Sequence, residues 1–493
     1  MRKTKIICTL GPASSDFDTI KAMVEAGMDV ARLNFSHGDR ATHLDYIRIV
    51  RDVSQELNRP IAILQDLQGP KIRVGEMEAG VVLTPGEQTV ITMDDVVGTA
   101  GRFSSTYKGL ARDVKVDDPI LINDGLLKLR VDQVSGSDIH CSVVYGGPLK
   151  SHKGINLSLS SISTPALTDK DKEDLEFGLS QDVDYIALSF VREAADLEQV
   201  RELVKRSGKR THVIAKVERH EAVEAMESVV AASDAVMVAR GDLGVEMLLE
   251  QVPAIQKSLI DTCHSHLKPV ITATQMLESM IQNPRPTRAE VSDVANAILE
   301  GTDAVMLSGE TSVGRYPVEA VRTMARIAQT TEARLRASPL YIDGFEEYSI
   351  SNSVAHAACQ LAQNIKAKAI VCFTENGFST RILSKYRQPI PVIAVTPTES
   401  VQRRLVLYWG VQSLRLQEVY STDAMIVLAE QAAVEHGFVA KGDVVVMIAG
   451  LPLAITGVTN LIKAHRIGEQ VAGELPRPRG DGASQLNSNS LHG

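Results

Sequence analysis

Short apolar runs that each end in a polar or charged residue recur along the first two thirds of the chain. Such continuous runs are typical of parallel strands buried on both faces. Amphipathic stretches between them predict helices. Eight strands alternating with helices indicate an α/β fold, a (β/α)8 barrel of the TIM type. The predicted strands are 5–10, 30–35, 61–66, 185–190, 213–218, 235–240, 269–274 and 304–308, and the predicted helices include 16–26, 43–57, 169–179, 195–206, 221–232 and 250–266.

A segment rich in Val, Thr and Gly interrupts the barrel after its third strand. Its short runs predict antiparallel strands joined by turns, hence an inserted small β-barrel domain above the barrel. The Gly- and Pro-rich edges suit hinges, so the insertion is expected to be a lid. The predicted strands of the insertion are 81–83, 88–92, 119–122 and 126–131. We assign 1–69 and 169–345 to the barrel and 70–168 to the lid.

The last third of the chain again alternates strand and helix patterns. It predicts a separate doubly wound α/β domain over 346–472. The tail 473–493 is rich in Gly, Pro, Ser and Asn and is predicted to be disordered. The expected strands are 369–373, 391–395 and 444–448, and the expected helices are 349–366, 380–386, 399–409 and 422–436.

Composition narrows the class of protein. A length of 493 residues corresponds to roughly three domains. A net charge of −9 with 4% aromatic residues argues against nucleic acid as the main partner. No run approaches the ~18 apolar residues of a membrane helix, so no membrane partner is expected. Five widely spaced cysteines without a C-x-x-C motif are typical of a reduced cytoplasmic protein, not of a disulfide framework or a zinc site.

Polar side chains follow the predicted strands at their carboxyl ends, where barrels of this kind carry their active sites. The set combines cations, separated carboxylates and hydroxyls, as phosphoryl transfer with a divalent metal requires. The chain has no G-x-x-x-x-G-K-[ST] loop, so phosphates must be held by side chains and metal. The residues are Arg32, Asn34, Ser36, Asp66, Arg73, Ser189, Lys216, Glu218, Arg240, Asp242, Thr274, Ser308 and Glu310.

The strand 213–218 carries a lysine and a carboxylate on one face, because Lys216 and Glu218 are two residues apart. Pointing together into a site, they could serve a phosphoryl group and its Mg²⁺. The alternative is an exposed ion pair on an edge strand. The apolar neighbours Val213 and Val217 favour burial, and a buried lysine without a partner is costly.

Two further motifs have competing interpretations. The glycines around Asp242 let the backbone approach an anion, but Asp242 as the cap of a strand-to-helix turn is at least as plausible. Thr287 and Glu290 have the spacing of a capping box, and here the structural interpretation is favoured. Thr274, at the end of a predicted strand, is a proton-relay candidate.

Taken together, these residues and motifs resemble one family, the pyruvate kinases. The matching pieces occur in the family's order from about residue 4 to residue 467, and the ordered set is far more specific than any single fragment. The pieces are 31–38, Asp66 with 69–73, 188–190, 215–218, 239–244, 272–280 with 284–290, and 307–311.

The resemblance implies phosphoryl transfer from phosphoenolpyruvate to ADP, giving pyruvate and ATP. It implies Glu218 and Asp242 as ligands of Mg²⁺ or Mn²⁺, and Lys216 as the cation that stabilises the phosphoryl group and the enolate. The remaining implied roles are Arg32 and Arg73 as phosphate clamps; Gly241, Asp242 and Thr274 for the substrate carboxylate; Thr274 and Ser308 for protonating the enolate; and Arg32, Asn34, His37 and Lys153 for the nucleotide.

Two departures from the family pattern concern a cation site and the lid. Many members bind a second, monovalent cation through residues that match Asn34, Ser36 and Asp66 and through the backbone oxygen of a Thr. In this chain Leu67 occupies the position of that Thr. Lys71 stands where potassium-dependent members have Glu, so its ammonium could replace K⁺; the alternative is a solvated loop lysine. The lid sequence 154–158 lacks the Pro-Gly pair that the family usually has there. This departure directly follows Lys153 and therefore concerns the assignment of Lys153 to the nucleotide.

The family also places a phosphorylated allosteric effector in its last domain, and the resemblance implies a homotetramer. The strand-to-helix turn here offers hydroxyls and N–H groups suited to a sugar phosphate, assisted by the loop at about 450–460, and a plain Ser/Thr helix cap is an equal alternative. Phe378 replaces a basic residue of some members, which favours a monophosphate over fructose 1,6-bisphosphate. The effector residues are Thr374, Asn376, Gly377, Ser379 and Thr380.

Two other functions compete with this interpretation. One is another Mg²⁺-dependent barrel acting on phosphoenolpyruvate or a pyruvate enolate, such as a lyase, for which the large lid has no obvious nucleotide to close over. The other is a catalytically idle sugar-phosphate sensor. Chemically competent residues at every proposed catalytic position argue against the sensor.

Overall fold

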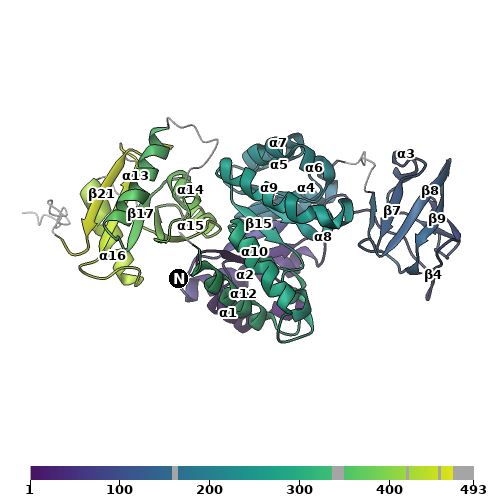
Figure 1. The fold of residues 1–493 in the computed structure, drawn as a ribbon, viewed down its shortest axis with the longest axis horizontal. Helices are drawn as coiled ribbons and strands as arrows, with labels where there is room; N and C mark the ends of the chain where they lie inside the picture. The colour runs from purple at the N-terminus through teal and green to yellow at the C-terminus, as the bar shows by residue number, and fades with distance from the viewer. Residues whose placement is uncertain (1, 158–164, 336–348, 418–420, 453–456, 470–493) are drawn as a thin grey trace, which may run out of the picture.

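A closed barrel of eight parallel strands forms the centre of the molecule (Figure 1). The computed structural model describes residues 2–157, 165–335, 349–417, 421–452 and 457–469. The strands pair in the order β1-β16-β15-β14-β13-β12-β3-β2, so the predicted TIM-type barrel is confirmed. Their bounds are β1 Lys5–Thr9, β2 Val30–Asn34, β3 Ala62–Asp66, β12 Tyr185–Leu188, β13 His212–Val217, β14 Ala235–Ala239, β15 Val270–Ala273 and β16 Ala304–Leu307.

Helices surround the barrel, with two departures from the expected pattern. The helix expected over 221–232 is divided at Ala225 into α6 and α7. The one expected over 250–266 is a short 3-10 turn followed by α9, which has a proline in its first turn. The helices are α1 Phe17–Ala26, α2 Arg40–Glu56, α4 Asp169–Ser180, α5 Ala194–Arg206, α6 His220–Glu224, α7 Met226–Ala232, α8 Arg240–Glu246, α9 Val252–Ser265, α10 Arg288–Glu300, α11 Gly309–Ser312 and α12 Pro317–Glu332.

The barrel interior follows the two-residue period of its strands. Apolar side chains such as Leu64, Ile214 and Met237 fill it, while the alternate positions pack outward on the helices. The inward series continues into polar residues at the carboxyl ends: Leu64 leads to Asp66, and Ile214 leads to Lys216. The same inward-facing positions therefore form both the apolar core and a cluster of polar residues at the carboxyl end of the barrel, which we call the barrel mouth.

The insertion lies between β3 and β12 and has its own core, which includes Val74, Ile91, Phe103 and Leu129. Its strands form a six-stranded sheet in the order β11-β7-β8-β9-β5-β6 and a two-stranded sheet, β10-β4, rather than a ring of eight like the central barrel. The elements are β4 Val82–Leu83, β5 Gln88–Thr92, β6 Arg102–Ser104, α3 Leu110–Asp113, β7 Pro119–Ile122, β8 Leu127–Ser135, β9 Asp138–Tyr145, β10 Gly147–Pro148 and β11 Ile155–Leu157.

The last domain has a five-stranded sheet in the order β19-β18-β17-β20-β21, with β21 antiparallel to β20. It is an α/β domain, as expected, although β19 and β21 were not predicted. The tail 473–493 lies outside the described residues. The elements are α13 Ile350–Asn364, β17 Ala369–Phe373, α14 Phe378–Lys385, β18 Val392–Thr396, α15 Glu399–Leu405, β19 Val411–Arg415, α16 Thr422–Glu435, β20 Val444–Ala449 and β21 Leu461–Arg466.

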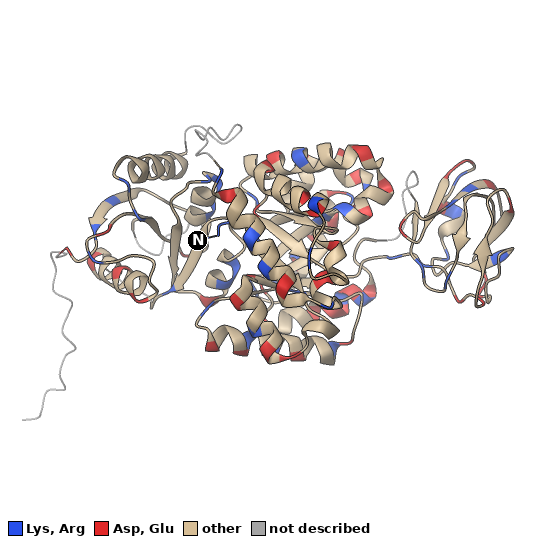
Figure 2. Ribbon diagram, turned by 60° about the horizontal axis from the view of Figure 1, so that its bottom comes forward, with Lys and Arg blue, Asp and Glu red and all other residues tan. Residues whose placement is uncertain are grey.

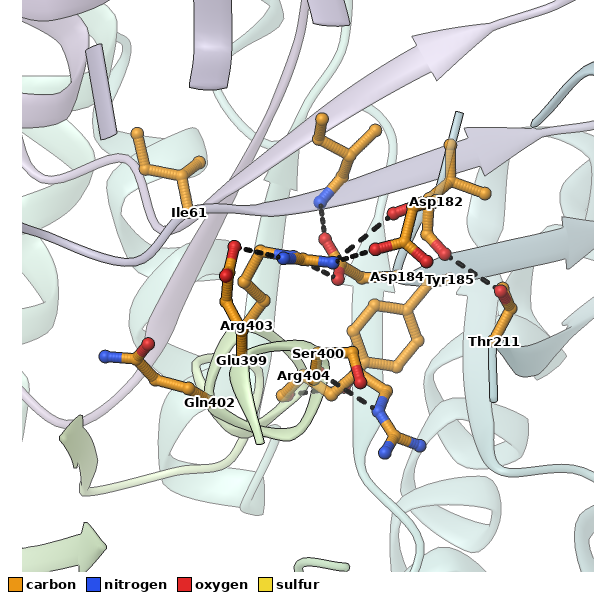
Figure 3. A network of polar contacts seen from close by, with 12 residues as sticks. Ile61, Asp182, Asp184, Tyr185, Thr211, Glu399, Ser400, Gln402, Arg403 and Arg404 are labelled. Atoms are coloured by element: carbon orange, nitrogen blue, oxygen red, sulfur yellow. Dashed lines mark hydrogen bonds and ion pairs between the residues drawn. The ribbon is translucent and has the colours of Figure 1, made fainter. Parts of the chain in front are cut away.

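Buried ion pairs fix the last domain to the amino-terminal end of the barrel. Lys385 Nζ lies 2.7 Å from Asp303 Oδ2, and both side chains are fully buried. Arg403 Nε lies 2.7 Å from Asp184 Oδ1 (Figure 3). Asp303 and Asp184 each immediately precede a barrel strand, so this interface is at the opposite end from the barrel mouth.

The surface mixes charges of both signs along the outer helices (Figure 2). All five cysteines are unpaired and buried. Among the described residues, no helix combines the length and the apolar character that crossing a membrane would need.

Candidate active site

A network of ion pairs occupies the carboxyl end of the barrel. Lys216 on β13 places Nζ 2.8 Å from Glu218 Oε1 and 3.2 Å from Asp66 Oδ1, and it donates to Ser189 Oγ at 2.6 Å. Arg32 on β2 lies 2.7 Å from the other oxygen of Asp66. The sequence-predicted pairing of Lys216 with Glu218 on one strand face is therefore present, and the structure adds Asp66 as a shared partner. Asp66 and Glu218 are each only 1% exposed.

The closeness of acidic and basic groups in this network keeps Asp66 and Lys216 charged. Burial alone would raise the pKa of Asp66, but Lys216 and Arg32 lower that pKa below its ordinary value. Burial lowers the pKa of Lys216, and the carboxylates of Asp66 and Glu218 more than reverse this, so its pKa is raised. Lys216 is consequently an ammonium at neutral pH, near the carboxyl end of β13.

Burial raises the pKa of Glu218, and the nearby carboxylate of Asp242 raises it further, against the opposing effect of Lys216. The two carboxylates repel each other across a small space, which a divalent cation would relieve. Both offer the hard oxygen ligands that Mg²⁺ prefers. Among the described residues no cluster of three or more metal-ligating side chains occurs, so a metal here would complete its shell with substrate or water oxygens. The donor set fits the divalent ion implied by the resemblance.

Helix α8 starts directly where β14 ends. Its N-cap is Ala239, without a side-chain cap, and Asp242 lies within the first turn. The alternative prediction of Asp242 as a cap is therefore wrong, because the chain enters the helix before reaching it. Gly241 N donates to Thr274 Oγ1 at 2.8 Å, and a Cβ at Gly241 would lie 3.3 Å from the same oxygen. This glycine allows the two turns to approach closely.

Thr274 has a φ of +68°, a left-handed conformation that is costly for a β-branched residue. Arg240 holds this turn: its Nη2 donates to Thr274 O at 2.8 Å, and its Nη1 lies 2.7 Å from Asp293 Oδ1. The sequence suggested Arg240 as a charge for the phosphate. In the structure its guanidinium instead supports the Thr274 turn.

Ser308 follows β16 and donates its backbone N–H to Glu310 Oε2 at 2.7 Å. The other oxygen of Glu310 accepts from Leu277 N at 3.0 Å, which ties this turn to the segment after Thr274. Sequence reasoning missed Thr9, whose Oγ1 accepts from Arg32 Nη1 at 2.8 Å. The inward register of β1 is the signal that could have identified it.

The predicted nucleotide residues surround the end of β2. Asn34 Oδ1 accepts from Ser36 N at 3.1 Å, and His37 follows on an exposed turn. Burial lowers the pKa of His37, and the charges of Arg73, Lys71 and Arg32 lower it further, so three cations act on this turn. A positive potential of this kind suits the phosphates of a nucleotide.

Arg73 and Lys153 belong to the insertion rather than to the barrel mouth. Arg73 Nη1 donates to His152 O at 3.0 Å, and Lys153 O accepts from Val74 N at 2.8 Å. The stem of Lys71 lies beside Gly154. These residues come from the segments 71–74 and 152–154, which lie side by side in the insertion, Arg73 forming a bridge with Gly154.

Asp66 and Leu67, two of the four residues expected to bind a monovalent cation, already contact other residues at this end of the barrel. Leu67 O accepts from Ser189 Oγ at 2.8 Å, and both oxygens of Asp66 have cationic partners. At the barrel mouth, the carboxylate of the predicted cation site is therefore paired with basic side chains of the protein itself.

Comparison with known proteins accounts for this arrangement. The family description "Pyruvate kinase, barrel domain" matches residues 1–321, and "Pyruvate kinase, alpha/beta domain" matches residues 352–465. This chain belongs to the pyruvate kinase family. It is 49% identical over 471 residues to a pyruvate kinase of Mycobacterium intracellulare, covering 95% of this chain and 99% of the relative. It is 45% identical over 477 residues to one of Staphylococcus aureus, covering 96% of this chain and 82% of that relative.

A solved pyruvate kinase structure from Cryptosporidium parvum matches the fold with a TM-score of 0.89 and 36% identity, covering 94% of this chain and 96% of that one. The family membership inferred from the motifs is thereby confirmed, as is the assignment of the chain as an enzyme. The barrel, the insertion after the third strand and the last α/β domain all belong to one pyruvate kinase architecture.

The predicted effector loop of this family member lies at the start of α14. Gly377, with a φ of +92°, donates its N–H to Thr374 Oγ1 at 2.9 Å, and Asn376 Oδ1 accepts from Phe378 N at 3.0 Å. Ser379 Oγ lies 2.6 Å from Thr459 Oγ1. Thr380 is fully buried and donates to Cys372 Sγ. Part of the assisting loop, residues 453–456, lies outside the described residues.

Proposed function

We propose that this enzyme transfers the phosphoryl group of phosphoenolpyruvate to ADP, forming pyruvate and ATP. The observation that carries the proposal is the buried ammonium of Lys216, held between Asp66 and Glu218 at the barrel mouth. The bond between phosphorus and the enol oxygen breaks, a bond to an oxygen of the ADP β-phosphate forms, and the enolate takes a proton on carbon.

Each nearby residue then has a definable task. Lys216 stabilises the negative charge on the phosphoryl group in transit and on the enolate oxygen. Arg32, fixed by Asp66 and Thr9, and Arg73 from the insertion clamp the phosphate. A divalent ion bound by Glu218 and Asp242 would supply charge stabilisation for the transferring oxygens.

The turns after β14 and β15 are assigned to the other end of the substrate. Gly241 and Asp242 present backbone N–H groups, and the Thr274 hydroxyl lies 2.8 Å from Gly241 N, so these groups can hold the substrate carboxylate. Thr274 and Ser308 are assigned to the relay that protonates the enolate carbon. The strained φ of Thr274 supports a role beyond packing, because such strain is concentrated at functional sites.

The nucleotide is assigned to Arg32, Asn34, His37 and Lys153, with the insertion closing as a lid that excludes water. Exclusion of water matters because water would otherwise accept the phosphoryl group. Lys71 supplies the charge that a monovalent cation provides elsewhere, so K⁺ is not required. Its electrostatic effect on His37 supports its position near the nucleotide end of the site.

The proposal extends to regulation and assembly. A phosphorylated effector binds at the turn carrying Thr374, Asn376, Gly377 and Ser379, with Thr380 supporting the helix start from within. The chain assembles as a homotetramer, which light scattering would test. Five buried, unpaired cysteines support a cytoplasmic location, where thiols stay reduced.

The decisive test is ATP formation from phosphoenolpyruvate and ADP with Mg²⁺, comparing the wild type with Lys216→Met. Lys172→Met is the matched control, because Lys172 lies half-exposed on α4 and pairs only with Asp169 among the described residues. We expect the control to keep full turnover and Lys216→Met to lose at least about 1,000-fold in kcat. Equal turnover in all three proteins would refute the mechanism, and a wild type without turnover would refute the function itself.

A further inference from the structure

Asp171 is a buried carboxylate that no step of the proposed mechanism uses. It lies in the first turn of α4 and is 0% exposed. Its Oδ1 accepts from Gly69 N at 3.1 Å. Its Oδ2 accepts from Thr168 N at 3.0 Å and from the Thr168 hydroxyl at 2.5 Å. One side chain therefore joins two segments that lie on either side of the insertion in the sequence.

These contacts lie where the chain passes between the barrel and the insertion, which stands to one side of the barrel in Figure 1. Where the chain enters the insertion, Leu67 packs in the barrel core and Ile72 packs in the core of the insertion. Where it leaves, Leu157 belongs to the insertion core and Leu167 to the barrel core. The carboxylate of Asp171 thus holds the chain at both connections.

Part of this arrangement is ordinary helix capping. Thr168 and Asp171 form the capping box of α4, since the Thr168 hydroxyl also accepts from Asp171 N at 3.1 Å. A capping box does not need the third donor, Gly69 N, which is 102 residues away in the sequence. Hydrogen bonds to a carboxylate are roughly twice as strong as those between neutral groups. The contact with Gly69 therefore fixes a distant turn to the start of α4.

The Gly69 turn also packs against the barrel mouth. Gly69 has a φ of +69°, and a Cβ there would lie 2.7 Å from Cδ2 of Phe190. The backbone N–H of Phe190 donates to Glu218 Oε2 at 2.9 Å. The turn is therefore held between Asp171 and the residue that hydrogen-bonds the proposed metal ligand.

Two residues with proposed roles follow this turn closely. Lys71 N donates to Gly69 O at 2.9 Å, and Arg73 is two residues further along the chain. Each residue adds at most ~3.6 Å to the reach of a chain. The place where Gly69 is held therefore limits where the side chains of Lys71 and Arg73 can go when the insertion moves.

We propose that Asp171 is a positioning residue that fixes both ends of the insertion to the barrel, so that the closing lid brings Arg73 to the barrel mouth. The inference rests on the proposed function, in which the lid excludes water. A lid released at one end would close imprecisely and admit water. Phosphorus would then form a bond to the water oxygen as its bond to the enol oxygen breaks, so that phosphoenolpyruvate and water give pyruvate and inorganic phosphate.

Asp171→Asn tests this role with almost no change of shape. A carboxylate accepts through both oxygens, whereas an amide accepts through its oxygen and donates through its nitrogen, so either Gly69 N or Thr168 N loses its acceptor. Asp196→Asn is the matched control. Asp196 is a buried capping carboxylate of the barrel helix α5, and it accepts from Arg192 N at 2.9 Å, without a contact to the connections of the insertion.

Hydrogen–deuterium exchange of the free, full-length chain examines the connections without turnover. A lost hydrogen bond to a carboxylate corresponds to about a tenfold change in a local opening equilibrium. We therefore expect the backbone around Gly69 or Thr168 to exchange about tenfold faster in Asp171→Asn, and at the wild-type rate in Asp196→Asn. Unchanged exchange at both segments in Asp171→Asn would overturn the proposal.

The inorganic phosphate released per ATP formed, measured with phosphoenolpyruvate, ADP and Mg²⁺, tests the positioning itself. We expect this ratio to rise at least about tenfold in Asp171→Asn and to keep its wild-type value in Asp196→Asn. Faster exchange with an unchanged ratio would overturn the positioning role and leave Asp171 as a helix cap. A wild type that forms no ATP would refute the proposed function and the positioning role with it, whereas the exchange rates would still decide whether Asp171 holds the two connections.

A second variant covers the case in which Asp171→Asn does not fold. Thr168→Val removes one hydroxyl donor from the same carboxylate, at a half-buried position, and leaves Gly69 N with its acceptor. We expect faster exchange around Thr168 and a higher ratio of inorganic phosphate to ATP. An unchanged ratio in Thr168→Val, with Asp171→Asn unfolded, would overturn the proposal.

Discussion

The buried ion pair between the barrel and the last domain leads to an asymmetric prediction. Lys385 Nζ and Asp303 Oδ2 lie 2.7 Å apart with both side chains fully buried. Asp303 has other partners: Arg387 at 3.0 Å and the backbone N–H of Val270 at 2.8 Å. For Lys385, Asp303 is the one acidic partner within the described residues. Removing either side of the pair should therefore have unequal consequences.

The magnitudes follow from what each substitution leaves behind. Asp303→Asn leaves a buried ammonium without its counter-charge and should cost about 3–5 kcal/mol. Lys385→Met leaves a carboxylate that Arg387 and Val270 still satisfy, so it should cost only about 1–2 kcal/mol. The double variant also removes the ammonium and should be more stable than Asp303→Asn alone, because Arg387 then lacks its acidic partner but Lys385 no longer does.

Trp409 provides the assay. It is the chain's one tryptophan and is 4% exposed; Arg387 lies over its ring at 4.9 Å, and its carbonyl accepts from Ser384 on α14. Its fluorescence during urea unfolding therefore reports the opening of this interface. Equal destabilisation by the two single variants, or a double variant less stable than Asp303→Asn, would show that Lys385 and Asp303 do not depend on each other unequally.

Three further predictions concern the barrel mouth. Asp242→Ala should raise the Mg²⁺ concentration for half-maximal activity at least about tenfold, since one of two carboxylate ligands is lost; an unchanged Mg²⁺ titration would exclude Asp242 as a ligand. Replacing K⁺ by a large organic cation at fixed ionic strength should leave activity unchanged, whereas Lys71→Glu should make activity depend on K⁺; a collapse in the wild type would contradict the role of Lys71. Because the pKa of Asp66 is lowered in the folded state, its stabilising effect is complete above its unfolded pKa of about 3.9 and is lost as the pH falls through its lower folded value. The unfolding temperature of Asp66→Asn should therefore fall less below pH 4 than that of the wild type, and parallel curves would contradict this.

Much of this architecture could be predicted from the alternation along the strands. The inward series that fills the barrel with Leu64 and Ile214 continues to Asp66 and Lys216, so a correct strand register already places the charges together. The capping box of Thr287 and Glu290 could be predicted for a different reason: its contacts join residues that are close in the sequence.

Features that depend on contacts between distant turns could not be predicted. The positive φ of Thr274 and the support it receives from Arg240 arise where two strand ends meet, and no local pattern encodes that meeting. Strands β19 and β21 were missed because their apolar and polar positions do not alternate, and strand β9 was missed although Ile139, Cys141 and Val143 alternate with polar residues. The strand-end reasoning placed Arg73 at the carboxyl end of the barrel, whereas it belongs to the insertion, and the role of Lys153 came from the family resemblance alone.

In the proposed mechanism, the ammonium of Lys216 stabilises the phosphoryl group in transit at the barrel mouth. Single-turnover formation of ATP from phosphoenolpyruvate and ADP, measured with saturating Mg²⁺ in wild type and Lys216→Met, tests it most directly because it isolates the chemical step from product release. We predict rapid ATP formation by the wild type and a chemical step at least about 1,000-fold slower in the variant, with both proteins folded alike. A chemical step of equal rate in the two proteins would contradict the claim.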